Sequence, residues 1–297
     1  MAKDAKTKVD LGGVPETLLW NLYQRASEAR RPDAILEDPK AVELVDSIDY
    51  PFERFGKGGL GQWQALRTRR FDEEVRRFLA DRPEGTVVAL GEGLETQFWR
   101  VDNGRVRWLT VDLPEIVALR ERLLPAPSPR VQAIGCSALD DTWIEHVDAS
   151  RGLLLCAQGL LMYFQPEEVH QLIGMCAERF RGATMVFDGV PPWFSRRTLE
   201  GAMRTAGGYQ SPPMPWAVDA AEKARLRKIP HVADLRDLTP PRGRGLLYGF
   251  VFPLLNRIRA FREMGISGLP IMAMRFEESD RTPVSGEESG ADPATDR

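Results

Sequence analysis

Two glycines lie where an apolar segment ends, and they could bring the backbone close to a ligand. Gly91 and Gly93 directly follow residues 86–90, whose sequence is TVVAL. Glycine at a strand-to-helix turn lets the chain approach a ligand closely because it has no Cβ. Asp112 ends the next apolar segment, about 20 residues later, where a carboxylate can accept both hydroxyls of a ribose. The sequence therefore predicts a nucleoside site at Gly91, Gly93 and Asp112.

Residues around this turn narrow the class of nucleoside. Glu92 and Glu95 flank the glycines, and Thr96 stands where a dinucleotide-binding turn would have its third glycine. Two carboxylates would repel a diphosphate, whereas they suit a ligand with a sulfonium and an ammonium group. S-adenosylmethionine is therefore favoured over NAD, and an NAD-dependent oxidoreductase remains an alternative.

The elements that must position these residues follow an α/β pattern. Short runs rich in Val, Ile and Leu alternate with helix-like segments at residues 114–124 and 166–180. Buried strands alternating with helices predict a parallel sheet covered on both faces, with its ligand site at the carboxyl ends of the strands. The expected strands are Thr86–Gly91, Arg107–Asp112, Val131–Gly135, Gly152–Ala157 and Ala183–Asp188.

Helices are expected before the sheet. Residues 16–29 and 62–80 have apolar residues at helical spacing, and another helix should begin at Asp38-Pro39, an N-cap followed by proline.

The regular alternation stops after Asp188. Residues 191–229 are rich in proline and aromatic residues and predict an inserted cap with a helix near 217–227. A final pair of strands is expected near 231–235 and 271–276.

Composition limits the setting of the protein. The 297-residue chain has a net charge of −3, and residues 277–297 contain seven acids against two arginines, so residues 1–276 carry +2. We expect one domain over 1–276 and an acidic, disordered tail over 277–297. This balance excludes a nucleic-acid binder that works through bulk positive charge. With no signal peptide and no long apolar stretch, a cytoplasmic protein without a membrane partner is expected, whereas its oligomeric state stays open.

Three motifs occur in order: LGEGLETQFWR at 90–100, VDLPE at 111–115 and QGLLMY at 158–163. They resemble the leucine carboxyl methyltransferase family, and within it the bacterial branch that includes the tetracenomycin polyketide O-methyltransferase. The resemblance covers about residues 16–188 and is much weaker beyond. It implies a class I methyltransferase fold, a Rossmann-like sheet that binds S-adenosyl-L-methionine.

The same resemblance implies which residues bind the cofactor. Arg67 matches an arginine that holds the cofactor's carboxylate, Arg30 is a second candidate for that end, and Ser137-Ala138 stand where the family contacts adenine. Gln158 replaces a usual glutamate, and Glu95-Thr96-Gln97 replaces Asp-Thr-Arg. These departures indicate a subgroup with its own acceptor and leave a non-catalytic S-adenosylmethionine-binding module as another alternative. The expected cofactor-binding residues are Arg67, Gly91, Gly93, Asp112, Ser137, Ala138, Gln158 and Arg30.

The expected reaction is methyl transfer to an oxygen, a carboxylate or a hydroxyl, of a small metabolite. A carboxylate needs no base, whereas a hydroxyl needs one. Tyr163 and Asp188 lie just past expected strands, where the acceptor should approach, and Tyr163 is the catalytic candidate, with a packing role as the alternative. The three histidines, His146, His170 and His231, lack the spacing of metal ligands, so no metal is expected. An aromatic acceptor pocket is the other candidate feature, formed by Trp193, Phe194, Tyr209, Met214 and Trp216.

Overall fold

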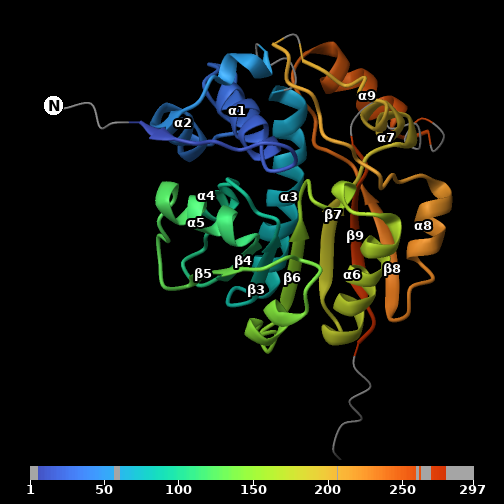
Figure 1. Cartoon of the computed structure of the whole chain (residues 1–297). Coiled ribbons are helices and arrows are strands. Elements are labelled where there is room, and N and C mark those ends of the chain that lie inside the picture. Colours follow the sequence, from blue (N-terminus) through green and yellow to red (C-terminus); the bar gives the residue numbers. More distant parts are fainter. Residues whose placement is uncertain (1–5, 57–60, 206, 259–260, 262–268, 279–297) are drawn as a thin grey trace, which may run out of the picture.

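A seven-stranded sheet in the order β5-β4-β3-β6-β7-β9-β8 forms the centre of the computed structural model (Figure 1). The structure describes residues 6–56, 61–205, 207–258, 261 and 269–278. Only β9 runs antiparallel to its neighbours in this sheet. The strands are β3 (Thr86–Leu90), β4 (Arg107–Asp112), β5 (Val131–Gly135), β6 (Leu153–Ala157), β7 (Thr184–Asp188), β8 (Val232–Leu238) and β9 (Ile271–Phe276). The predicted α/β class, with its mainly parallel sheet, is confirmed.

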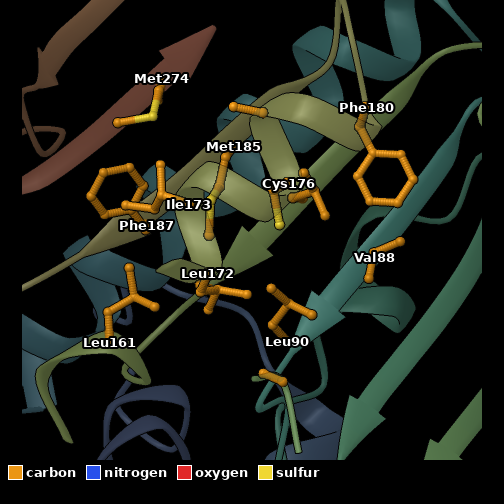
Figure 2. Close-up of a cluster of buried hydrophobic side chains, with 14 of the residues drawn as sticks. Val88, Leu90, Leu161, Leu172, Ile173, Cys176, Phe180, Met185, Phe187 and Met274 are labelled. Atoms are coloured by element: carbon orange, nitrogen blue, oxygen red, sulfur yellow. The ribbon is translucent and has the colours of Figure 1, made fainter. Parts of the chain in front are cut away.

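Helices cover both faces of the sheet, which explains why β3 and β6 are apolar and buried along their whole length. On one face, Leu172, Ile173 and Cys176 of α6 pack against Val88 and Met185 of the strands, as Figure 2 shows. The other face is covered by apolar residues of α3 and α4. The α-helices are α1 (Thr17–Ala29), α2 (Pro39–Ser47), α3 (Gly61–Asp81), α4 (Gln97–Val101), α5 (Pro114–Leu123), α6 (Pro166–Arg179), α7 (Pro192–Leu199), α8 (Ala220–Leu226) and α9 (Phe252–Leu255).

Shorter elements complete the chain. A two-stranded parallel pair links β1 (Thr7–Lys8) to β2 (Ile48–Asp49) beside α1 and α2. Single turns of tighter helix lie at Phe52–Phe55, Thr142–His146 and Leu161–Tyr163, and a π-helical turn lies at Leu247–Val251.

The parallel strands end at one edge of the sheet, and the N-terminal helices and the cap lie over that edge (Figure 1). Helix α2 begins as the Asp38-Pro39 signal predicts, because the Asp38 carboxylate accepts a hydrogen bond from the Ala41 backbone N–H at 3.1 Å. The loops after β3, β4, β6 and β7 therefore meet beneath these segments, which is where the candidate ligand-binding residues lie.

The cap differs from the expectation in extent. Helix α8 lies in the layer that covers the sheet, because Leu226 belongs to the same core cluster as Leu235 and Met274 of the strands. The part of the predicted 191–229 insertion that lies over the strand ends is thus its first portion, which includes the unpredicted helix α7. A second segment, residues 247–255, is helical and was also not predicted.

Glu277, the first residue of the predicted acidic tail, is hydrogen-bonded to the folded domain. The Glu277 backbone N–H donates to the carbonyl of His231, and its carbonyl accepts from Gly182, both at 2.8 Å. Residues 279–297, most of the predicted tail, lie outside the described residues. Among the described residues, no helix has the length and apolarity needed to cross a bilayer.

Replacing Leu172 tests the packing of α6 on the sheet. Leu172 is 1% exposed in the cluster of Figure 2, so Leu172→Ala should reduce the free energy of unfolding by about 2–5 kcal/mol through lost burial and a cavity. Urea unfolding measures the change. The control Leu199→Ala removes a side chain that is 56% exposed and should cost less than about 0.5 kcal/mol. Equal effects of the two substitutions would contradict this packing.

Candidate active site

The glycine turn after β3 has a backbone that requires glycine. Gly91 and Gly93 have φ values of +61° and +54°, in the left-handed region. A Cβ at Gly91 would lie 2.7 Å from Cδ1 of Leu160, so a side chain there would clash as well. The turn therefore keeps the backbone close to its neighbours, and the predicted approach to a ligand stays a prediction.

Asp112 at the end of β4 is joined to this turn. Its Oδ2 accepts a hydrogen bond from the Gly93 N–H at 2.7 Å, and its Oδ1 accepts one from the Leu113 N–H at 2.8 Å. Burial raises the pKa of Asp112 above its ordinary value. Each carboxylate oxygen has two lone pairs, so both oxygens can still accept a ribose hydroxyl. The acceptor oxygens of Asp112 thus fit the hydroxyls of a nucleoside.

Glu92 and Glu95 do not face a ligand, so the prediction that their charges select a sulfonium over a diphosphate is wrong. Both carboxylates are paired within the protein. Glu92 is buried and pairs with Arg120 at 2.8 Å, while the Thr110 hydroxyl donates to it. Glu95 is buried and pairs with Arg25 and Arg100, each at 2.9 Å. Their charges are neutralised within the protein, so they do not discriminate between a sulfonium and a diphosphate.

The arginines that pair with these glutamates also hold the turn. Arg120 Nη1 donates to the carbonyl oxygens of Gly93 and Glu95, both at 2.7 Å, and Arg25 Nη2 donates to that of Leu94 at 2.8 Å. The sequence analysis identified neither arginine. Arg25 could have been identified, because a charged residue on the apolar face of α1, three residues after Leu22, needs a buried partner.

Gln158 at the end of β6 has a structural reason to be neutral. Its Nε2 donates to Oε2 of Glu95 at 3.3 Å and to the Thr68 hydroxyl at 3.4 Å. A glutamate at position 158 would place a second carboxylate beside Glu95, whereas an amide donates to it. The Gln158 amide is therefore part of the hydrogen-bond network around Glu95.

Arg67 of α3 is buried and held rigidly beside the loop after β6. Its Nε lies 2.9 Å from Oδ2 of Asp188, and its Nη1 donates to Gln64 at 2.8 Å. The Asp188 carboxylate also accepts a hydrogen bond from the Gly159 N–H at 2.6 Å. It is therefore paired with Arg67 and with the loop after β6, and it is not available to take a proton from a methyl acceptor. A Cβ at Gly159 would lie 2.5 Å from Nη2 of Arg67, so glycine leaves room for the guanidinium. A guanidinium fixed in this way suits a carboxylate.

Two of the other expected cofactor residues lie at the strand ends, and one lies elsewhere. Ser137 and Ala138 follow β5, next to Asp112, because β4 and β5 pair with Asp112 opposite Gly135. Arg30 is exposed at the end of α1, where its Nη2 lies 2.7 Å from Asp46, and it does not line the cavity described next. The structure thus brings Ser137 and Ala138 to the strand ends and leaves Arg30 apart.

A cavity of about 330 Å³ opens beside Arg67 and Gly159. Elements from both ends of the chain line it, including α1, α3, the loop after β6, the cap and the 247–255 segment. Trp193, Phe194, Tyr209 and Met214 of the predicted aromatic pocket are among its walls, but Trp216 is fully buried and donates to Glu222 at 2.9 Å. The aromatic lining consists of Trp20, Trp63, Tyr163, Trp193, Phe194, Tyr209 and Tyr248.

Comparison with known proteins assigns this architecture. Residues 19–177 match the family described as leucine carboxyl methyltransferase. The chain belongs to this family. It is 34% identical over 190 residues to the tetracenomycin polyketide synthesis O-methyltransferase TcmP of Streptomyces glaucescens, which covers 63% of this chain and 70% of that relative. The S-adenosyl-L-methionine-dependent methyltransferase dpfgK of Gibberella zeae is 28% identical over 193 residues, which covers 59% of this chain and 64% of dpfgK.

A solved structure agrees on the fold alone. The S-adenosylmethionine-dependent methyltransferase SibL, in its apo form, matches with a TM-score of 0.50 at 12% identity, covering 89% of this chain and 76% of SibL. Together with family membership, this confirms a class I methyltransferase that uses S-adenosyl-L-methionine. The alternative of an NAD-dependent oxidoreductase is therefore set aside.

The catalytic candidate Tyr163 lines the cavity beside Arg67. Burial raises the pKa of the Tyr163 phenol to about 12, and the Thr17 hydroxyl beside it acts in the opposite direction. A phenol with such a pKa stays protonated at neutral pH, so it can donate a hydrogen bond but does not act as a general base. His170 and His231 pair with Glu222 and Glu277 instead of lining the cavity.

Removing the Glu95 charge tests the ion pairs below the turn. Burial alone would raise the pKa of Glu95, but Arg25 and Arg100 outweigh it and lower the pKa to about 2, from an ordinary value of 4.5. The carboxylate therefore contributes stability that is fully present above pH 4.5 and is lost as the pH falls towards 2. Glu95→Gln should reduce the free energy of unfolding at pH 7 by about 3 kcal/mol.

Chemical unfolding from pH 7 to pH 3 measures this difference, which should shrink below pH 4.5 as the native protein loses the same charge. Glu37→Gln, at an exposed position, is the control and should have little effect at any pH. A constant difference across this range would show that the ion pairs are not what stabilises Glu95.

Proposed function

We propose that this methyltransferase transfers the methyl group of S-adenosyl-L-methionine to a carboxylate oxygen of an apolar, aromatic small molecule. One observation carries the choice of acceptor. The described residues that line the cavity beside Arg67 include no Asp, Glu, His, Lys or Cys.

The cofactor side of this proposal uses the residues at the strand ends. Asp112 would accept the ribose hydroxyls, Arg67 would pair with the carboxylate of the amino-acid portion, and Gly91 and Gly93 would let the backbone approach. Ser137-Ala138 would contact the adenine, and Gln158 would complete the wall of the site. When bound, S-adenosyl-L-methionine supplies a methyl group already activated on a cationic sulfur.

The acceptor side favours a nucleophile that is already ionised. A hydroxyl must lose a proton to a base, whereas a carboxylate attacks as it is. Tyr163 keeps its proton at neutral pH and Asp188 is committed to Arg67, so neither supplies a base. The apolar walls also favour a reaction in which a positive and a negative charge disappear together, because ions of opposite charge are poorly solvated there.

The size and walls of the cavity support an aromatic acceptor. Its volume of about 330 Å³ lies in the range of small-molecule sites, and flat rings pack well against tryptophan and tyrosine walls. Arg204 on the lining adds a positive charge that favours an acidic molecule. The name of TcmP, an O-methyltransferase of polyketide synthesis, agrees with an oxygen acceptor.

The acceptor group can be identified from the stability of the product. The enzyme is incubated with methyl-labelled S-adenosyl-L-methionine and a panel of polycyclic aromatic acids, each matched by the corresponding phenol. A carboxyl methyl ester releases labelled methanol in mild base, whereas a phenol methyl ether does not. We expect label from the acids in base-labile form only. Base-stable label from the phenols would overturn the carboxylate assignment while leaving the methyltransferase activity established.

Arg67→Ala tests the cofactor contact. Loss of a charged, hydrogen-bonded pair should weaken binding of S-adenosylhomocysteine by about 1.5–3 kcal/mol, as measured by calorimetric titration. Arg69→Ala is the matched control, because Arg69 lies on the same helix, makes no ion pair among the described residues and does not line the cavity. Unchanged affinity in Arg67→Ala would assign the carboxylate to another group.

A further inference from the structure

The segment after β8 exposes a stripe of large apolar side chains. Leu246, Leu247, Phe250, Leu254 and Ile258 have exposed fractions of 74%, 48%, 66%, 62% and 56%. Leu247, Phe250 and Leu254 lie three to four residues apart in the helical turns at Leu247–Val251 and Phe252–Leu255, which places them on one face. Leu246 and Ile258 flank these turns. Exposed large apolar residues that gather on one element mark an interaction surface.

The opposite side of the same segment faces the protein. Tyr248 lines the cavity, and its ring packs edge-on against Phe252 at 5.1 Å between centroids. Trp193 at the start of α7 lines the same cavity and is itself 44% exposed. Figure 1 shows α7 and α9 together over the edge of the sheet. The apolar stripe therefore borders the acceptor cavity.

Positive charge lies on both sides of the stripe. Residues 239–258 contain Arg242, Arg244 and Arg257 and no Asp or Glu, and Arg244 pairs with Glu28 and Asp33. Arg242 and Arg257 are exposed, and neither forms an ion pair with any residue that the structure describes. An apolar helical face rich in Leu and Phe and flanked by arginine is typical of a helix that lies in the interface of an anionic membrane.

We infer that the stripe formed by Leu246, Leu247, Phe250, Leu254 and Ile258 is a docking surface for an anionic lipid bilayer. The apolar side chains would enter the boundary between headgroups and acyl chains, and Arg242 and Arg257 would contact the headgroups. A second copy of the chain fits this surface poorly, because the described residues beside the stripe offer Arg242 and Arg257 but no exposed carboxylate of the segment to pair with them. This contact is peripheral, and it revises the expectation of no membrane partner.

Docking would give the acceptor cavity access to molecules dissolved in the bilayer. This consequence rests on the proposed apolar acceptor. The docking surface itself does not, because vesicle binding is measured without cofactor or acceptor. Failure of vesicle binding and failure of carboxyl methylation are therefore separate results.

Co-sedimentation of the full chain with vesicles tests the inference. We expect binding to phosphatidylcholine vesicles that contain phosphatidylglycerol, roughly tenfold weaker binding to phosphatidylcholine alone, and loss of binding when salt is raised to about 0.5 M. Phe250→Ser/Leu254→Ser should reduce partitioning by at least about tenfold, because two apolar side chains no longer enter the membrane. Arg257→Gln should weaken binding to the anionic vesicles only.

Matched controls use exposed positions elsewhere on the molecule. Val14→Ser, at a side chain that is 41% exposed, and Arg105→Gln, at an exposed arginine, should both bind vesicles as the native protein does. Absence of binding to every vesicle by the native chain would overturn the inference. It would also be overturned by a concentration-dependent dimer in size-exclusion chromatography that Phe250→Ser/Leu254→Ser abolishes, because the surface would then belong to a second copy.

Discussion

One buried guanidinium, that of Arg100, joins four separate parts of this methyltransferase. From α4 it pairs with Asp38, which caps α2, with Asp72 of α3 and with Glu95 of the glycine turn, at 2.8, 2.8 and 2.9 Å. Removing these charges from water is costly, and only complete pairing offsets the cost. Displacing one of the four parts would leave a buried charge without its partner. The N-terminal helices are therefore fixed to the glycine turn after β3.

This constraint explains features that do not touch a ligand. Glu92 and Glu95 are needed as partners for Arg120, Arg25 and Arg100, which in turn donate to the carbonyl oxygens of the turn. Gln158 supplies an amide where a carboxylate would face Glu95. The local departures from the family motif thus form one consistent arrangement. Helices α1 and α3 also contribute walls to the cavity beside Arg67, so the glycine turn and this cavity share one support.

Local patterns predicted most of the elements. Predicted strand bounds agree with β3 to β7 to within one residue, because each strand is a short run rich in apolar residues. Burial along the whole length explains this pattern in β3 and β6, whereas the edge strand β5 is largely exposed. Asp38-Pro39 marked the start of α2 for a local reason as well, a cap hydrogen bond. The 247–255 segment was missed because it contains Pro253 and no charged residue, so no alternation of apolar and polar residues marks it as a helix.

The sequence predicted some residues of the candidate site but not the ion pairs around them, because the paired residues are distant in sequence. Gly91, Gly93 and Asp112 follow from the strand-turn-helix motif. Arg67 pairs with Asp188, which is far away in the chain, so no short-range spacing in the sequence predicts this ion pair. The charges of Glu92 and Glu95 were assigned to a ligand because the buried arginines opposite them could not be seen in a linear motif. Only the fold shows which charges are already neutralised.

The central claim is that buried arginines hold the glycine turn in its binding conformation. Calorimetric titration of S-adenosylhomocysteine into Arg120→Met/Glu92→Gln tests it most directly, because this pair of changes removes the contacts to the Gly93 and Glu95 carbonyls without leaving an unpaired buried charge. The account predicts a folded protein whose affinity falls on the order of tenfold. Unchanged affinity in the folded variant would contradict it.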